Sequence, residues 1–151
     1  MKKILLVSIL TFLIYNVTYA QNGTYKSTRF EFISQSVPSR NRVELKYNTL
    51  TIQINEIQGE FIDGKILWEM KSDDNQSEFL EMCLKSLKNS HYDEANKAFV
   101  KVYYADIKML GQTVGQSEIF IWKFVNENNY RIDMFDSVKK TINRFDNVTK
   151  L

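Results

Sequence analysis

The chain of 151 residues has one cysteine, one proline and one histidine, and these scarcities remove several classes of function. A single cysteine, Cys83, cannot form an internal disulfide, so the stability of the fold has to come from packing. Cys83 and the single histidine, His91, supply too few ligands for an ordinary zinc site. They also form the one combination that suggests a cysteine nucleophile and its base, but a cysteine among leucines is typical of a buried core position.

Motifs of the common enzyme classes are missing as well. The sequence has no glycine-rich phosphate loop, no Gly-x-Ser-x-Gly nucleophile elbow and no His-Glu-x-x-His pattern. The acidic stretch 73–78 lacks the ligand spacing and the turn glycine of an EF-hand calcium loop. The sequence therefore predicts no catalytic residue, no metal site and no cofactor, and an extracytoplasmic hydrolase is the least favoured of three functional hypotheses.

The chain also has no net charge once its N-terminal residues are set aside. The whole chain has 20 Lys and Arg residues against 18 Asp and Glu residues. Without Lys2 and Lys3 the balance is 18 against 18, so the remaining chain has no overall field to attract nucleic acid or an anionic membrane. We therefore expect no nucleic-acid partner and no stable membrane insertion.

The first 20 residues are typical of an export signal. A basic start at 1–3 precedes an apolar run over 4–14, and residues 18–20 form a small-x-small cleavage site. We expect cleavage between Ala20 and Gln21 and a mature protein that is secreted or periplasmic. An uncleaved membrane anchor is the alternative, but the apolar run is short for the roughly 30 Å hydrocarbon core. The predicted organisation is a signal peptide at 1–20 and a single β-rich domain at 21–151.

The pattern of the remaining chain predicts antiparallel strands joined by short turns. Strand candidates cover 24–33 and 42–54, the second with a turn or bulge near its middle. Asp63-Gly64 predicts a two-residue type I′ hairpin, because both residues tolerate a positive φ. This turn would place Phe61 opposite Ile66 on an apolar face.

Residues 75–89 predict an internal helix. Leu80, Leu84 and Leu87 recur at helical spacing, and Asn75 followed by Glu78 resembles a capping box. Further strands are predicted at 98–109, 117–125 and 130–135, and residues 136–145 predict a short C-terminal helix. The expected fold class is mainly β, or β-rich α+β: an antiparallel six- to eight-stranded barrel or strongly curved sheet with one internal helix.

Residues 22–25, Asn22-Gly23-Thr24-Tyr25, place a glycine and an aromatic residue at the start of the first strand. This opening resembles that of the lipocalin-like (calycin-type) small secreted β-barrels, with Tyr25 in place of the usual tryptophan. The resemblance implies an antiparallel barrel that holds a small ligand.

Alternation along three predicted strands sorts them into two apolar faces. The predicted hairpins place Tyr104 opposite Trp122 and Phe124 opposite Arg131, on a face where aromatic rings meet a few charges. Rings supply contact area and a charged group fixes orientation, as a small-molecule pocket requires. The other face, which includes Ile119, is aliphatic and is expected to be ordinary core. The predicted ligand-binding residues are Tyr104, Phe120, Trp122, Phe124, Arg131 and Asp133.

Two interpretations of the aromatic face remain open. It is either a ligand pocket or a structural face on which Arg131 pairs with Asp133 and stacks on the rings. The first hypothesis is a secreted, non-catalytic binding protein that holds a small apolar or amphipathic ligand in an aromatic-lined β-barrel, with Arg131 orienting the ligand if it is anionic. The alternative is an extracytoplasmic protein–protein interaction module with a filled core and a partner protein of unknown identity.

Overall fold

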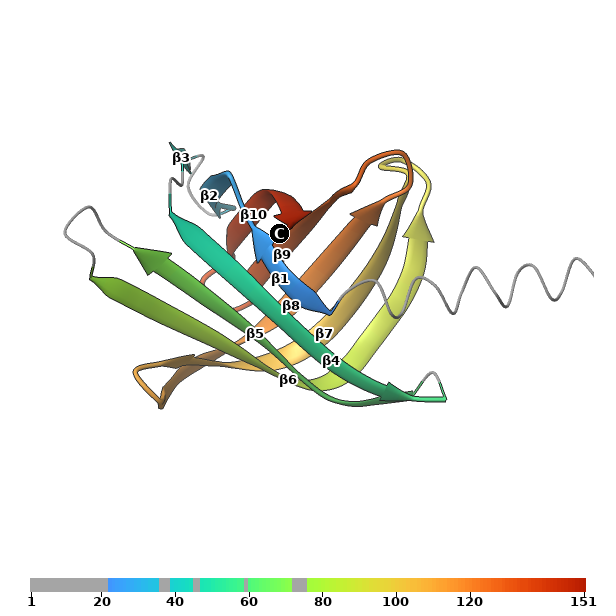
Figure 1. The fold of residues 1–151 in the computed structure, drawn as a ribbon, viewed down its shortest axis with the longest axis horizontal. Helices are drawn as coiled ribbons and strands as arrows, with labels where there is room; N and C mark the ends of the chain where they lie inside the picture. Colours follow the sequence, from blue (N-terminus) through green and yellow to red (C-terminus); the bar gives the residue numbers. More distant parts are fainter. Residues whose placement is uncertain (1–21, 36–38, 45–46, 59, 72–75) are drawn as a thin grey trace, which may run out of the picture.

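The computed structural model describes residues 22–35, 39–44, 47–58, 60–71 and 76–151. Ten strands lie in one antiparallel sheet (Figure 1). Within the described ranges no helix has the length and apolar character needed to cross a membrane. The strands are β1 (Gly23–Lys26), β2 (Arg29–Ser34), β3 (Ser39–Glu44), β4 (Asn48–Ile57), β5 (Glu60–Lys71), β6 (Ser77–Asp93), β7 (Ala98–Met109), β8 (Gln112–Phe124), β9 (Asn129–Asp136) and β10 (Thr141–Lys150).

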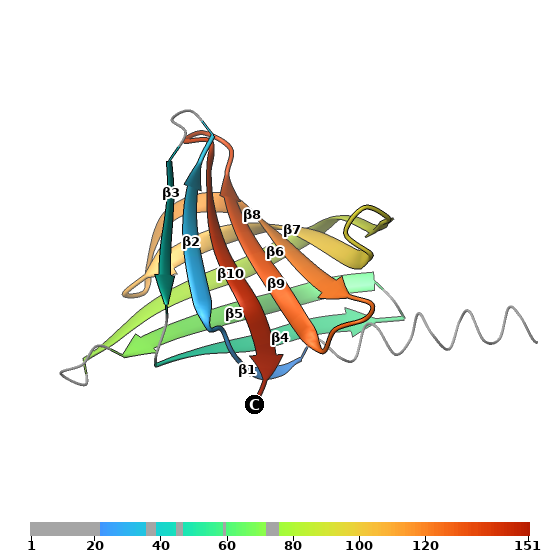
Figure 2. The same cartoon turned by 90° about the horizontal axis from the view of Figure 1, so that it is seen from above.

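Eight of the strands close into a barrel. Their order is β1-β4-β5-β6-β7-β8-β9-β10, and the ring closes because β1 pairs with β10 as well as with β4. β2 pairs with the first half of β10, and β3 pairs with β2. Figure 2 shows β2, β3, β9 and β10 crossing in front of β4 to β7. The predictions of a mainly β fold and of an antiparallel barrel are confirmed, at the upper end of the six to eight strands expected.

The single strand predicted over 24–33 is broken into β1 and β2 at Ser27. The Ser27 hydroxyl donates to the carbonyl oxygen of Asp146 at 2.8 Å. The backbone of Ser27 also exchanges two hydrogen bonds with the side-chain amide of Asn48, at 3.1 and 2.6 Å. Because Ser27 and Asn48 are buried, these bonds replace the backbone partners that the chain loses where it leaves the ladder.

Most of the interior is apolar, and inward residues of the barrel strands build it by alternation. The rings of Phe30, Trp68 and Phe145 pack together with centroids 4.9 to 5.8 Å apart. The predicted aliphatic face is the barrel interior. The buried core cluster also contains Tyr25, Leu50, Ile52, Ile54, Ile66, Met82, Leu84, Tyr103, Ala105, Ile107, Ile119, Ile121, Tyr130, Ile132 and Val148.

The predicted turn at Asp63-Gly64 is wrong, because both residues lie within β5 and Gly64 stands opposite Ile54 of β4. The glycine is needed for a different reason. A Cβ at this position would lie 3.0 Å from Leu84 Cδ1 and 3.1 Å from the carbonyl oxygen of Gln53. Close approach between neighbouring strands therefore explains this glycine, without any change of chain direction.

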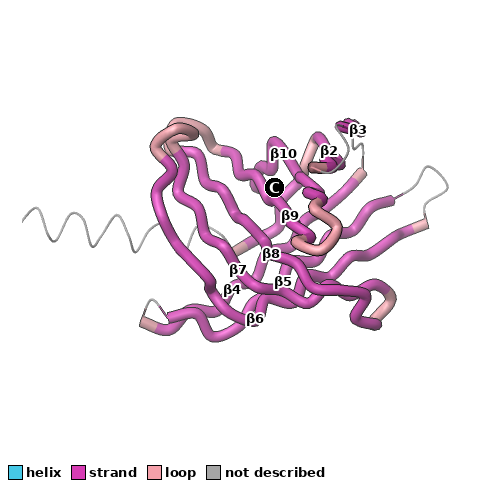
Figure 3. Tube along the Cα trace, turned by 180° about the vertical axis from the view of Figure 1, so that it is seen from behind, coloured by secondary structure: helices cyan, strands magenta, loops and turns pink. Residues whose placement is uncertain are grey.

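The internal helix predicted over 75–89 is also wrong, because residues 77–93 form β6 (Figure 3). Leu80 and Leu84 pack with the core, and a β-bulge after Leu84 leaves Lys85 without a partner in the ladder. Leu87 consequently returns to the inner face, opposite Tyr103. The bulge changes the spacing of inward residues from two to three, so three leucines of a strand imitate a helical period.

The short C-terminal helix predicted over 136–145 is replaced by a turn and β10. The carboxylate of Asp136 accepts hydrogen bonds from the N–H groups of Val138 and Lys139, both at 2.9 Å. This arrangement is similar to a helix N-cap, which explains the prediction. The chain then turns back at Lys140, whose φ is 55°, and β10 gains ladder partners on both edges from β9 and β2.

The strands predicted at 98–109, 117–125 and 130–135 are confirmed as β7, β8 and β9. A tight turn at Leu110-Gly111, with φ values of 50° and 77°, joins β7 to β8 in place of the longer connection left between the strands predicted at 98–109 and 117–125. Tyr104 therefore lies opposite Glu118, and Trp122 lies opposite Arg131. Both registers differ from the predicted ones by an even number of residues, so the two faces are as predicted although the individual pairs are not.

Candidate functional site

The predicted ligand-binding residues share the outer face of the barrel. They alternate along their strands with core residues such as Ile119 and Ile121, so their side chains point away from the interior. Tyr104 lies apart from the others on β7, where it lines a surface pocket of about 320 Å³ together with Glu118 and Asp106. The structure brings the other five together on β8 and β9: Phe120, Trp122, Phe124, Arg131 and Asp133.

The rings of this outer face cover a small apolar cluster of their own. Val100 and Val102 on β7 are only 1% and 3% exposed, although they lie outside the interior core. They stand opposite Trp122 and Phe120 of β8. These two rings therefore have a packing role. The indole N–H of Trp122 is buried and finds no hydrogen-bond acceptor among the described residues.

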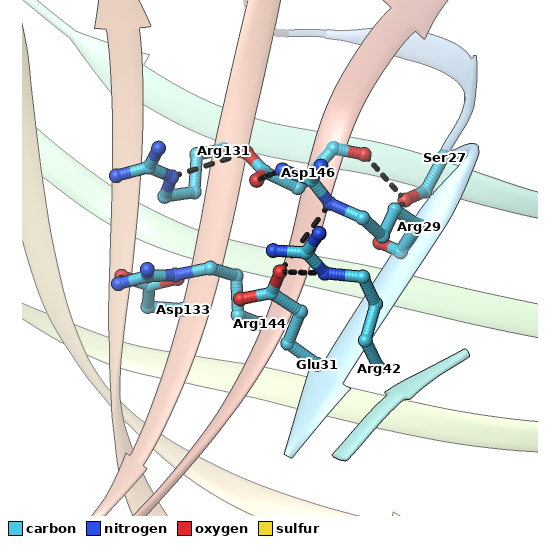
Figure 4. Close-up of polar contacts among 8 residues, drawn as sticks. All are labelled: Ser27, Arg29, Glu31, Arg42, Arg131, Asp133, Arg144 and Asp146. Atoms are coloured by element: carbon cyan, nitrogen blue, oxygen red, sulfur yellow. Dashed lines mark hydrogen bonds and ion pairs between the residues drawn. The ribbon is translucent and has the colours of Figure 1, made fainter. Parts of the chain in front are cut away.

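Arg131 and Asp133 take different partners within a network of ion pairs (Figure 4). Asp133 accepts two hydrogen bonds from Arg144, at 2.8 and 2.9 Å. Arg131 donates to Asp146 at 3.2 Å and lies over the ring of Phe124, 5.2 Å from its centroid. The expected pairing of Arg131 with Asp133 is therefore wrong, whereas the expected stacking of Arg131 on a ring is confirmed.

The network continues across β10, β2 and β3. Asp146 also binds Arg29, and Glu31 lies between Arg29 and Arg42 at 3.4 and 2.8 Å. Burial by itself would raise the pKa of Asp146, but the hydrogen bond from Arg29 and the charge of Arg131 lower the pKa of this carboxyl below its ordinary value. The charges of the outer face are thus engaged with one another, which argues against Arg131 as the orienting group for an anionic ligand.

A second group of polar residues lies inside the barrel. Lys101 on β7 donates to Glu56 on β4 at 2.6 Å, and both side chains are only 11% exposed. β5 and β6 separate these two strands in the sheet, so the ion pair spans the interior. Lys101 stands opposite Ile121, a core residue, which places the lysine on the inner face.

β-Bulges orient the residues around this ion pair. On β5 the extra residue is Ile62, and its bulge places Phe61 opposite Glu56. The ring of Phe61 packs against the core and stands 5.3 Å from the ring of Tyr103. On β6 the bulge described above turns Leu87 inward opposite Tyr103. We call Glu56, Phe61, Lys101 and Tyr103 the lumen cluster.

Two polar atoms of the lumen cluster have no hydrogen-bond partner among the described residues, namely the hydroxyl of Tyr103 and Oε2 of Glu56. Tyr103 is fully buried. Burial and then the charge of Glu56 raise the pKa of Tyr103 well above its ordinary value, so the phenol stays a neutral hydrogen-bond donor. A buried polar group without a partner costs about 1–3 kcal/mol. A bound group that accepts from Tyr103 and donates to Glu56 would remove this cost.

The inner face continues from the lumen cluster to an end that is open to solvent. Phe99 lies on the inner face of β7, opposite Tyr92 of β6 and Lys123 of β8. The rings of Tyr92 and Phe99 are 5.1 Å apart and are 45% and 44% exposed. Lys101 and Tyr103 lie two and four residues further along β7, roughly 7 and 13 Å along the strand at its usual rise. Tyr92, Phe99 and Lys123 therefore lie together at the end of the inner face that is nearer to solvent than the lumen cluster.

Cys83 and His91 lie eight residues apart on β6, about 26 Å along the strand, which is too far for a nucleophile and its base. Sγ of Cys83 lies 2.9 Å from a carboxylate oxygen of Glu81. Burial, reinforced by this carboxylate, raises the pKa of the Cys83 thiol. In the part of the chain that the structure describes, no three His, Cys, Asp or Glu side chains gather as metal ligands.

No family model, curated protein or solved structure matches the chain. The eight-stranded antiparallel barrel is compatible with the lipocalin-like fold that residues 22–25 resemble. A fold shared by many binding proteins does not by itself assign a function, so function has to be argued from the side chains of this chain.

None of Glu56, Lys101 and Tyr103 is among the residues predicted from the sequence. A pattern that points to two of them is nevertheless present. Glu56 continues the inward alternation of Ile52 and Ile54, and Lys101 has the parity of the core face of its strand. A charged residue on a core face requires an internal partner, and two of opposite sign indicate a pair.

Proposed function

We propose that this protein is a non-catalytic binding protein that holds one small amphipathic molecule inside the barrel, with its polar end at the lumen cluster. The observation behind the proposal is the pair of unpartnered polar atoms on Tyr103 and Glu56, buried on the inner face that ends in the exposed rings of Tyr92 and Phe99. An eight-stranded barrel has room for its own side chains or for one small ligand. Apolar walls with a few polar groups are typical of small-molecule sites.

The proposed site lies on the opposite face of the sheet from the one predicted from the sequence. On the outer face, Arg131 and Asp133 are engaged by Asp146 and Arg144, and the rings pack on Val100 and Val102. The lumen cluster instead keeps one donor and one acceptor unused. A ligand gains more where hydrogen-bonding groups lack partners than where they already have them.

Native mass spectrometry of the mature protein, purified from its own host without detergent, tests the proposal. We expect an adduct of the mass of one small molecule. Leu87→Trp adds an indole on the inner face opposite Tyr103 and should remove the adduct. Ser86→Trp adds the same indole on the outer face opposite Tyr104 and should retain it. Circular dichroism of both variants verifies that the barrel is intact.

Two results would contradict this proposal. A clean mass for the wild-type chain, together with no binding of added amphiphiles, would leave the barrel interior without a ligand. Loss of the adduct in Ser86→Trp and its retention in Leu87→Trp would move the ligand to the outer face.

We propose that the protein acts outside the cytoplasm after cleavage between Ala20 and Gln21. Residues 1–21 lie outside the described residues, so the support is the export-signal pattern of the sequence. The intact mass of the protein in the extracellular or periplasmic fraction tests this. A chain that begins at Gln21 is expected, and a full-length chain in the membrane fraction would contradict the proposal.

A second candidate function is a protein-interaction module that uses the outer face. The observation in its favour is the buried N–H of Trp122, which lacks an acceptor among the described residues, beside an arginine that lies over a ring. Tryptophan and arginine are enriched at the centres of protein interfaces. This candidate predicts that a partner cross-linked in the host is lost in Trp122→Ala, while a partner retained by that variant would argue against it.

A further inference from the structure

We propose that two copies of this chain associate edge to edge through β3, as a two-fold dimer in which the sheet of one copy continues into the sheet of the other. Two observations carry the proposal. One edge of β3 has no neighbouring strand among the described residues, and the ion pairs that lead to this edge end at an exposed arginine. The surface is separate from the lumen cluster, and the association does not depend on ligand binding.

β3 is the last strand of the sheet. It pairs with β2, and no described strand pairs with its other edge. Figure 2 shows β3 at the end of the row formed by β9, β10, β2 and β3. An open strand edge presents main-chain donors and acceptors with which a further strand can pair.

The residues of β3 that face the open edge follow from the ladder. Gln35, directly after β2, donates its N–H to a carbonyl oxygen beside β10, in step with the β2–β10 pairing. Main-chain groups of successive residues point to opposite edges of a strand, so those of Phe30 face β3. Phe30 pairs with Val43. The N–H and C=O groups of Arg42 and Glu44, on either side of Val43, therefore face the open edge.

The charges of the outer face alternate in sign toward this edge. Hydrogen bonds of 2.8 Å join Arg144 to Asp133 and Arg42 to Glu31 (Figure 4). Glu31 is fully buried, whereas the side chain of Arg42 is 50% exposed. The row across β9, β10, β2 and β3 is thus Asp133, Arg144, Glu31 and Arg42. It ends on a positive charge, so the residue opposite it on an added strand should be acidic.

The chain itself supplies this acidic residue. When β3 pairs antiparallel with β3 of a second copy about a two-fold axis at Val43, Arg42 of each copy stands opposite Glu44 of the other. Within one copy, Glu44 stands opposite Arg29, and Arg29 stands opposite Asp146. The row of charges in one copy therefore continues into the second copy with alternating sign throughout.

Other registers of the two strands fit less well. The main-chain groups that face the open edge belong to every second residue, so only shifts by an even number of residues retain the hydrogen bonds. A shift by two residues in one direction places the two Arg42 residues opposite each other, and in the other direction the two Glu44 residues. Like charges directly opposite are destabilising. The register centred on Val43 is therefore the favoured one.

Sedimentation equilibrium of the mature protein over a range of concentrations measures the association. We expect a monomer–dimer equilibrium that weakens at high salt, because charge pairs at the edge contribute to it. Glu44→Arg places like charges opposite each other and should weaken dimerisation at least about tenfold. Glu127→Arg makes the same change in an exposed turn between β8 and β9 and should leave dimerisation unchanged.

Cysteine cross-linking on a Cys83→Ser background tests the register. The two Cα atoms of a non-hydrogen-bonded antiparallel pair lie about 4.5 Å apart, a separation that a disulfide can span. Val43→Cys should therefore form a covalent dimer under mild oxidation. Asn41→Cys is the matched control on the same face of β3. In this register the two copies of residue 41 are offset by roughly 13 Å along the strands, so this variant should not cross-link.

Three results would overturn the proposal. A wild-type mass that stays monomeric at every concentration, with no covalent dimer of Val43→Cys, would show that the β3 edge does not join two copies. Cross-linking of Asn41→Cys as efficient as that of Val43→Cys would exclude the register. Dimerisation that is unchanged in Glu44→Arg would exclude the charge pairing, and the cross-linking comparison still decides the register should Glu44→Arg fail to fold.

Discussion

Lys101 and Glu56 form an ion pair between two strands that are not neighbours in the sheet. Each residue occupies an inward position where alternation along its strand would otherwise place an apolar side chain. The pair therefore joins β4 to β7 through the interior, in addition to the ladders that run around the barrel. Removing one charge leaves the other buried, which makes the pair a sensitive point for stability.

We expect Lys101→Met to lower the free energy of unfolding by about 3 kcal/mol, because the Glu56 carboxylate would be left in the interior without its partner. The double variant Lys101→Met/Glu56→Leu should recover most of this loss, since apolar side chains of similar size need no desolvation. Urea unfolding followed by tryptophan fluorescence measures both. If the double variant is as unstable as Lys101→Met, the unpartnered carboxylate of Glu56 is not the cause of the lost stability.

Asp146→Asn should lower the free energy of unfolding at pH 7 by about 3 kcal/mol, because Arg29 and Arg131 lose their shared carboxylate. The folded-state pKa of Asp146 is lowered, so its stabilising effect is fully present above the unfolded pKa of about 4. The effect is lost as the pH falls through the folded value. Urea unfolding of both proteins at neutral pH and at about pH 3 should show a smaller difference in acid. A difference independent of pH would contradict this assignment.

Gly64→Ala should destabilise the barrel by about 1–2 kcal/mol, because the new methyl group would meet the carbonyl oxygen of Gln53 at 3.1 Å. That carbonyl belongs to a paired strand and cannot easily move. Gly115→Ala is the matched control, since a Cβ at Gly115 has no heavy atom within 4 Å among its described surroundings. Thermal unfolding should show a lower Tm for Gly64→Ala only. Equal effects at both positions would argue against close approach at Gly64.

Cys83 should react slowly with thiol reagents near neutral pH, because burial and then Glu81 raise the pKa of its thiol. The pH profile of the labelling rate should have its midpoint above the ordinary value of about 8.5. Glu81→Gln removes the neighbouring charge and should shift the profile to lower pH. An identical profile for the two proteins would mean that burial alone controls the reactivity of Cys83.

Features that depend on local alternation could be predicted from the sequence. Both registers of β7, β8 and β9 were misplaced by even numbers of residues, yet Ile119 faced the core and Trp122 the opposite side as expected. A strand has a side-chain period of two, so any even slip preserves the faces. The antiparallel β class and the division into two apolar faces follow from this short-range regularity.

Features that depend on pairing between distant segments could not be predicted in the same way. The bulge that returns Leu87 to the inner face gave the leucines of β6 a helix-like spacing. Gly64, which the close approach of neighbouring strands requires, gave the sequence pattern of a turn. The partner of Lys101 lies 45 residues away in the chain, and nothing local connects it with Glu56.

By itself, the sequence determined the strand class, the sorting of side chains into two faces and the export-signal pattern at 1–20. Only the tertiary structure decided which face is inside, because closure of β1 on β10 makes one side of the sheet concave and buries it. That closure turned the aliphatic face into the core, placed the predicted aromatic face outside, and brought Glu56, Lys101 and Tyr103 together in the interior. Alternation is a property of each strand alone, whereas curvature and closure arise from the whole set of pairings.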